Sequence, residues 1–194
     1  MDIIEISKIL FFASIIVWII PPIRQYKTRL FIFFLILGIM DPLSLLYKYL
    51  TNFPFPLEGY LVFNYIMLLT ILPGKTFYKY KPYLLAFTPI MILPMLYTIQ
   101  KPITYLIVVF LFITMFFIIL RNFIITSTKS RKLNFFYMVL LLYLLTIILK
   151  FTVLIFGFID ATANFIVTSI FQAVIGLYFS IFREDNPRFI FKLQ

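Results

Sequence analysis

The chain has 194 residues, of which 63% are hydrophobic and only 12% charged, and its formal net charge is +10. A soluble domain of this length cannot bury so much apolar surface, so the composition predicts a protein of the lipid bilayer. Cys and His are both absent, which excludes disulfides, thiolate chemistry, zinc sites and imidazole catalysis, and we expect no cofactor.

Seven apolar segments follow one another along the chain, and each approaches the roughly 20 residues that a membrane-spanning helix needs. The expected spans are Ile3–Ile23, Leu30–Tyr47, Gly59–Gly74, Pro82–Gln100, Pro102–Leu120, Leu133–Leu149 and Ala161–Phe182. Their side chains are apolar on every face, which favours helices over the alternating strands of an outer-membrane barrel. Pro89 and Pro94 predict a kinked or broken fourth span.

The basic residues concentrate in every second gap between these spans and in the C-terminal tail. Thirteen of the seventeen lie there: Arg24, Lys27, Arg29, Lys75, Lys79, Lys81, Arg121, Lys129, Arg131, Lys132, Arg183, Arg188 and Lys192. Positive charge marks the cytoplasmic side, so we expect the N-terminus outside, the C-terminus inside, and a multi-pass protein of the plasma or cytoplasmic membrane. Basic residues at the ends of the segments contact anionic lipid headgroups. We therefore expect the positive charge to serve binding to the bilayer, and we expect no nucleic-acid partner.

The chain also contains a weak internal repeat. A shift of 102 residues places Lys27–Phe77 on Lys129–Phe179 without gaps, with nine of fifty-one pairs identical. Spans one to three then fall on spans five to seven, which gives repeat one at about 3–77, a linker helix at 82–100 and repeat two at about 102–182. The predicted fold is an all-α, seven-helix membrane domain over residues 1–182, arranged 3+1+3 with both halves in the same orientation. A short cytoplasmic tail, 183–194, follows.

The stretch Trp18–Arg29, which reads WIIPPIRQYKTR, looks like the end of the first helix in PQ-loop proteins. There a Pro-Gln pair, in whose place this chain has Pro21-Pro22, precedes a short basic turn with a tyrosine. An apolar second helix follows and carries an acidic residue, as Asp41 does here. This resemblance to the SWEET and PQ-loop superfamily implies a 3+1+3 bundle that moves a small solute, in some members coupled to protons. Parallel three-helix repeats joined by one helix are the plan of SWEET-type transporters.

Asp41 is the leading candidate for a functional group. It lies twelve residues beyond Arg29, about 18 Å deep in an apolar core of about 30 Å. A carboxylate at that depth is protonated, paired or turned towards a wet cavity, which indicates a substrate-binding or proton-coupling acid. The structural alternative is an Asp that bonds a neighbouring helix, or that caps a new helical stretch at Pro42.

Three further polar residues are expected near the same depth: Thr70, Tyr143 and Gln172. In the repeat alignment Tyr143 falls on Asp41 and Gln172 falls on Thr70, which predicts two equivalent pairs at a midplane site. Asn64 is a secondary candidate nearer the outside. The alternative for each is a hydrogen bond between helices, worth about 0.6 kcal/mol.

Lys150 and Ser44 are the remaining secondary candidates. Lys150 could form a Schiff base or pair with Asp41, but its repeat partner Lys48 predicts that both lysines reach the outer headgroups instead. Ser44 and Lys48 could form a nucleophilic dyad, yet Thr146 and Lys150 repeat the same stripe, which favours structure over an enzyme active site.

These observations predict a small-solute transporter rather than an enzyme. Asp41 would bind or couple, Thr70, Tyr143 and Gln172 would line the site, and four prolines would act as hinges: Pro21, Pro22, Pro89 and Pro94. The alternative is a non-transporting sensor or a subunit of a membrane complex, suggested by the aromatic surface of 26 Phe and 13 Tyr. The partner would then be a membrane protein or a second copy of the chain rather than a small-molecule substrate.

Overall fold

The computed structural model describes residues 3–72, 74, 79–80, 82–84, 86–90, 101–157, 161–185 and 190–192. These residues are almost entirely helical. The helices with defined bounds are α1 (Ile3–Arg24), α2 (Phe31–Thr51), α3 (Leu57–Ile71), α5 (Lys101–Ser130), α6 (Phe135–Phe156) and α7 (Ala161–Ile181). Residues 82–84 and 86–90 of the expected fourth span are also helical.

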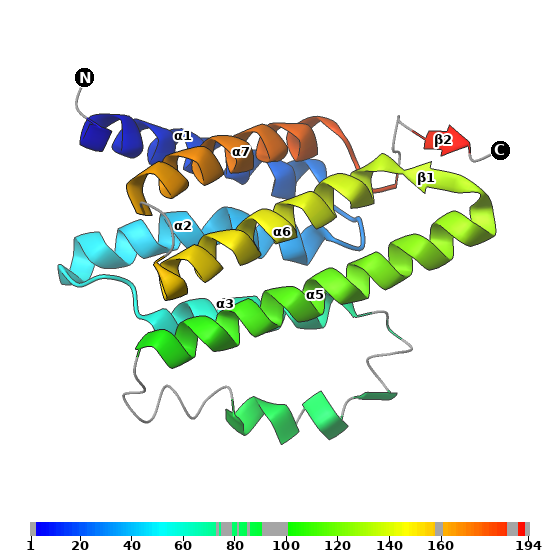
Figure 1. The fold of residues 1–194 in the computed structure, drawn as a ribbon, viewed down its shortest axis with the longest axis horizontal. Coiled ribbons are helices and arrows are strands. Elements are labelled where there is room, and N and C mark those ends of the chain that lie inside the picture. The colour runs from blue at the N-terminus through cyan, green and yellow to red at the C-terminus, as the bar shows by residue number, and fades with distance from the viewer. Residues whose placement is uncertain are drawn as a thin grey trace.

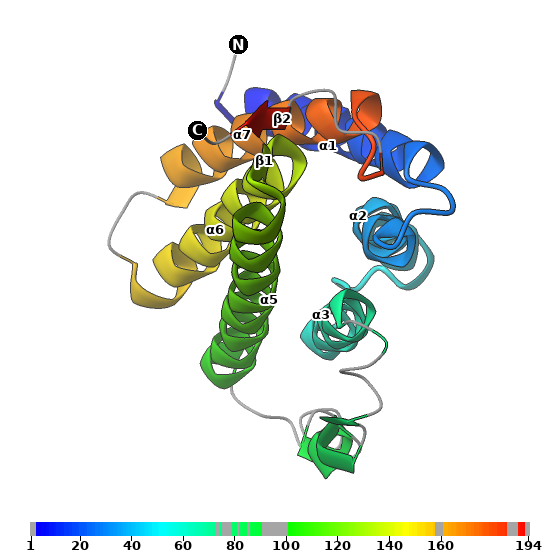
Figure 2. The same cartoon turned by 90° about the vertical axis from the view of Figure 1, so that its right-hand side faces the viewer.

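The six helices with defined bounds form a closed ring. Each packs on the next along the chain, α3 packs on α5, and the ring closes where α7 packs on α1 (Figure 2). The helices α1, α3, α5 and α7 run in one direction and α2 and α6 run in the other (Figure 1). We call the end of the ring where α1 begins the N-face and the end where α1 finishes the C-face.

Two glycines let α1 approach both of its neighbours closely. A Cβ atom on Gly38 of α2 would lie 2.7 Å from the Trp18 carbonyl oxygen and 2.9 Å from Cγ of Pro22. A Cβ atom on Gly176 of α7 would lie 2.8 Å from Cγ1 of Val17. Close contact at small residues is a main source of helix association in membranes, because lipid is as apolar as the helices and the hydrophobic effect does not drive them together.

Two helices extend beyond the expected spans. The helix α5 continues past Leu120 to Ser130, so Arg121 lies inside it rather than in a loop, because residues 121–130 contain no proline or glycine to end it. The helix α6 continues past Leu149 to Phe156 and ends where Gly157 takes a φ of 65°. The Gly157 N–H donates to the Val153 carbonyl oxygen at 2.8 Å, a usual C-terminal cap.

The prolines interrupt fewer helices than their positions suggest. The helix α1 remains helical through Pro21 and Pro22, both buried, and α2 remains helical through Pro42. Asp41 is therefore not the cap of a new helix. Pro89 lies in the helical residues 86–90, and Pro94 lies outside the described residues.

The C-terminal tail contains a strand that the sequence did not predict. Strand β2 (Ile190–Lys192) pairs antiparallel with β1 (Lys132–Asn134), with Leu133 opposite Phe191. Since β1 connects α5 to α6, this pairing attaches the tail to the C-face (Figure 1). The backbone of a tail segment can pair with any free strand edge, which is why composition alone does not reveal it.

The outer surface of the ring is apolar. Large exposed hydrophobic side chains lie on several helices, including Ile16, Ile23, Phe117, Val167 and Val174. Of the helices that the structure describes, α2, α5 and α6 contain spans long and apolar enough to cross a membrane: Phe31–Thr51, Ile103–Lys129 and Phe135–Phe156. Shorter apolar spans are Ile9–Arg24, Leu57–Ile71 and Ile166–Ile181. Soluble monomers rarely expose large apolar patches, so these helices are compatible with a membrane protein.

Candidate functional site

A cavity of about 340 Å³ lies inside the helix ring, and each of the six ring helices contributes to its wall. The polar lining residues are Ser14, Asp41, Tyr60, Asn64, Tyr105, Tyr143, Lys150 and Gln172. Most of the remaining wall is aromatic or aliphatic. The volume lies near the lower end of the range of about 300–1,000 Å³ that is usual for small-molecule sites.

The structure brings five of the seven sequence-predicted polar residues to this one cavity: Asp41, Asn64, Tyr143, Lys150 and Gln172. Ser44 and Thr70 do not line it, and each donates its hydroxyl within its own helix. The Ser44 hydroxyl donates to the Asp41 carbonyl oxygen at 3.0 Å, and the Thr70 hydroxyl donates to the Met67 carbonyl oxygen at 2.7 Å.

Thr70 was placed at the wrong depth by the expected span. The helix α3 ends at Ile71 rather than at Gly74, so Thr70 lies in its last turn at the C-face. Asn64, almost two turns earlier, takes the place on α3 that Thr70 was expected to fill.

The side chain of Asn64 is held in a fixed orientation but is incompletely bonded. Its exposure is 1%, and its Nδ2 donates to the Tyr60 carbonyl oxygen at 2.8 Å. Its Oδ1 has no hydrogen-bond partner among the described residues. A buried acceptor without a donor costs about 1–3 kcal/mol.

Asp41 of α2 and Lys150 of α6 place opposite charges on the cavity wall. The two side chains lie within electrostatic range of each other. Lys48, the repeat partner of Lys150, is exposed in the last turn of α2. Only Lys48 therefore fits the expectation that both lysines reach headgroups, because the extension of α6 to Phe156 moves Lys150 away from the helix end.

Aromatic rings close the cavity on the side of the C-face. We call Phe33, Phe34, Phe136 and Phe179 the phenylalanine plug, and all four are fully buried. The Phe179 ring centroid lies 4.8 Å from that of Phe34 and 5.0 Å from that of Phe136. Trp18 connects the plug to the cavity, with its ring 6.4 Å from Phe179 and 4.7 Å from Tyr143.

A polar network, which we call the clasp, lies beyond the plug at the C-face. Gln25 is fully buried, and its Nε2 donates to the carbonyl oxygens of Phe179 at 3.2 Å and Phe182 at 2.6 Å. Its Oε1 accepts from the Glu184 backbone N–H at 3.0 Å. The Glu184 carboxylate in turn accepts from the Leu30 N–H at 3.0 Å and the Tyr137 hydroxyl at 2.6 Å. The clasp thus joins the α1–α2 turn, the start of α6 and the end of α7.

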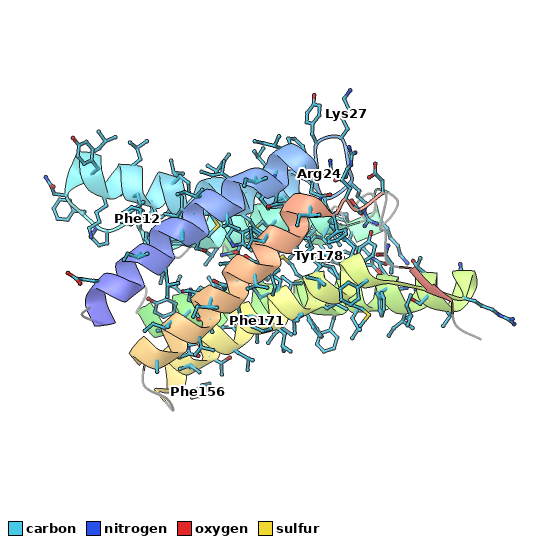
Figure 3. All side chains as sticks on the ribbon, turned by 90° about the horizontal axis from the view of Figure 1, so that it is seen from above. Phe12, Arg24, Lys27, Phe156, Phe171 and Tyr178 are labelled. Atoms are coloured by element: carbon cyan, nitrogen blue, oxygen red, sulfur yellow. The ribbon has the colours of Figure 1, made fainter. Side chains whose placement is uncertain are left out.

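Sequence reasoning did not identify Gln25 or Glu184. The available signals were an uncharged polar residue within the basic α1–α2 turn and an acid in the basic tail. Figure 3 labels Arg24 and Lys27 at the C-face, where this network lies, and Phe156 at the opposite end.

The described residues do not form a metal site. Among them, no group of three or more acidic side chains is placed to hold a metal ion. The cavity wall offers two charged side chains, hydrogen-bonding groups and aromatic surfaces. Comparisons with protein-family models, with curated proteins and with solved structures find no match to this chain.

Proposed function

We propose that the protein is a multi-pass membrane transporter that moves a small solute through the central cavity by alternating access. The observation that carries this proposal is the position of the cavity. It has polar and charged residues in its wall, lies inside a ring of apolar helices, and has the phenylalanine plug and the clasp on its C-face side. A site that is separated from one face of the membrane while lying nearer the other is what alternating access requires.

The lining residues support an opening towards the N-face. Phe11 of α1, Tyr60 of α3 and Tyr105 of α5 lie in the first halves of their helices, which begin at the N-face, and Ser14 lies at the middle of α1. The basic residues of the α1–α2 turn lie at the C-face, so the positive-inside rule makes the N-face external. The proposed state is therefore open to the outside and closed to the cytoplasm.

The arrangement of the ring supports two like-oriented halves. If α1, α2 and α3 swap places with α5, α6 and α7, the order of helix contacts around the ring stays the same. The direction in which each helix runs also stays the same (Figure 1). Phe34 and Phe136, which are partners in the repeat alignment, meet at 6.2 Å between ring centroids. A transporter built in this way moves one half against the other around a shared site.

The test is uptake into proteoliposomes of a panel of radiolabelled neutral amino acids, hexoses and monocarboxylates. The protein should give saturable uptake of at least one class, and Asp41→Asn should reduce that uptake. Glu58→Gln is the matched control, because Glu58 is an acid near the N-face that does not line the cavity. Equal uptake by wild-type and empty liposomes for the whole panel, or unchanged uptake by Asp41→Asn, contradicts the proposal.

A second candidate is a sensor that binds the same solute without moving it. The β1–β2 sheet favours this candidate, because it attaches the tail to the α5–α6 connection at the C-face. A shift of α6 on binding would be transmitted there. Saturable binding with no flux, or stable co-purification with a membrane partner in fixed ratio, would favour the sensor over the transporter.

A further inference from the structure

The start of α2 depends on a side chain from outside the helix. Its N-cap residue, Leu30, has an aliphatic side chain, which cannot accept a hydrogen bond. The third helical position, where a capping box has a Glu or Gln that accepts from the N-cap N–H, is Phe33 of the plug. Glu184 supplies a carboxylate instead, because its Oε2 accepts from the Leu30 N–H at 3.0 Å. The tail after α7 therefore caps a helix that is far from it in the sequence.

The helix α6, which the repeat alignment places on α2, is capped by its own segment. The Oδ1 of its N-cap residue, Asn134, accepts from the Phe136 N–H at 3.0 Å. Glu184 nevertheless reaches α6 as well, because its Oε1 accepts from the Tyr137 hydroxyl at 2.6 Å. One carboxylate thus connects the first turns of two helices that lie opposite each other in the ring, and it does so beside the plug.

The backbone and the side chain of Glu184 differ in how easily they can be released. The backbone N–H donates to Oε1 of Gln25, which is fully buried. The Glu184 side chain and the Tyr137 ring are only half-buried. A carboxylate that leaves a half-buried site can be hydrated, whereas a buried amide that loses its partners is left without them. Of these side chains, that of Glu184 is therefore suited to break its bonds and form them again.

From these features we propose that Glu184 is the latch of the phenylalanine plug, and that the C-face opens when its carboxylate releases α2 and α6. This inference rests on the proposed function, because it names the group that controls the closed side of the same cavity. While both bonds are present, the first turns of α2 and α6 are tied together and the rings of Phe34 and Phe136 stay in contact.

Release changes the two helices in different ways. The helix α2 loses the only carboxylate that the described chain places at its N-cap N–H, whereas α6 keeps the cap that Asn134 provides. The first turn of α2, which contains Phe33 and Phe34, is therefore the part that moves. The pairing of β2 with β1 holds the tail at the C-face, so the carboxylate can return to the same place.

The experiment measures how fast a thiol in the cavity reacts with a reagent added at the C-face, and it needs no transport. Leu37 lines the cavity one turn beyond Phe33, and Leu37→Cys introduces a single thiol into a chain without cysteine. The reagent is a small, charged methanethiosulfonate that does not cross membranes. Vesicles with the C-face outward are identified with Lys27→Cys, because Lys27 is exposed there (Figure 3). Where opening is fast compared with the reaction, the rate follows the population of the open state.

Two variants remove the latch in part and in whole. Tyr137→Phe keeps the ring but removes one of the two bonds, and it should raise the rate about tenfold. Glu184→Ala removes both bonds and should raise the rate at least as much. The double variant should react no faster than Glu184→Ala, because the hydroxyl acts through the carboxylate. Asp185→Ala is the matched control: it removes the same charge from the next residue, which pairs with Arg183, and should leave the rate unchanged.

Reaction from the N-face, measured in vesicles of the opposite orientation, should not become faster in any variant. An equal rise from both faces would mean that the whole protein is loosened, and it would contradict the latch. An unchanged rate from the C-face for either latch variant, or an equal rise for Asp185→Ala, would also overturn the proposal. Size-exclusion profiles check that each variant is folded. If Glu184→Ala does not fold, Tyr137→Phe decides alone, because it removes a single hydroxyl.

The outcomes separate this inference from the proposed function. Faster reaction from the C-face in both latch variants, with no flux of any solute in the panel, supports the latch and contradicts transport. Saturable flux by the wild-type protein, with unchanged reaction rates in the latch variants, contradicts the latch alone.

Discussion

The rings of Phe34 and Phe136 meet at the C-face end of the cavity with 6.2 Å between their centroids and 71° between their planes. They come from α2 and α6, which lie opposite each other in the helix ring. Asp41 and Tyr143 each follow seven residues later on the same two helices, about 10 Å further towards the N-face, and both line the cavity. The contact between the two phenylalanines is thus the point where the central space of the ring closes.

Removal of this contact should open the closed side. Phe136→Ala leaves a void among fully buried rings, with a stability loss of about 3–5 kcal/mol if the site cannot collapse. In proteoliposomes we expect an uncoupled leak of small solutes and a lower melting temperature. Phe117→Ala is the control, because Phe117 is 61% exposed on the outer surface of α5. Equal leak from both variants would assign the effect to general loosening rather than to the plug.

The buried hydrogen bonds of the clasp should stabilise the folded protein more than the exposed ion pair beside them does. Gln25→Leu leaves two carbonyl oxygens and the Glu184 N–H without their partner, at about 1–3 kcal/mol for each buried group that water does not reach. Asp185→Asn is the comparison, because Asp185 forms an exposed pair with Arg183 worth about 1 kcal/mol or less. We expect thermal unfolding to show a clear loss for Gln25→Leu and little change for Asp185→Asn.

Two glycines that are equivalent in the repeat alignment should respond differently to alanine. At Gly176 the new Cβ meets Val17 at 2.8 Å and Trp18 at 3.2 Å, so Gly176→Ala should destabilise by about 1–3 kcal/mol through overpacking. At Gly74 no described atom lies within 4 Å of the new Cβ, so Gly74→Ala should be neutral. Melting temperatures in one detergent compare the two, and a larger loss at Gly74 would contradict the close packing of α7 on α1.

The absence of cysteine in the natural sequence makes labelling experiments simple, since no background thiol has to be removed. Ser14→Cys should react with a membrane-impermeant maleimide added outside, because Ser14 lines the cavity, which we propose opens to the N-face. Ile16→Cys, 66% exposed towards the expected lipid, is the control and should not react. Asp185→Cys should react only after the membrane is made permeable. The opposite pattern for Ser14 and Asp185 would reverse the proposed orientation.

Much of the cavity wall was predictable, because polar residues inside apolar helices are rare and easily recognised. Asp41, Tyr143 and Gln172 were identified in this way and line the cavity together. Thr70 was also predicted to line the site but does not, because its depth depended on where α3 ends. An apolar segment followed by Pro73 and Gly74 does not define that end to within one turn.

The sequence alone determined that the chain consists of apolar helices with basic ends, because hydrophobicity and charge act on each segment separately and need no neighbour. Only the tertiary structure decided which polar groups share a space. Lys150 lies on the cavity wall within the extended α6, and the Asn64 amide donates to the Tyr60 carbonyl oxygen while its own oxygen has no partner among the described residues. Gln25 and Glu184 became partners across most of the chain length. Such relationships depend on how far each helix extends and on which of its faces turns towards the next helix. When every face of a helix is apolar, the sequence pattern does not show which face points inward.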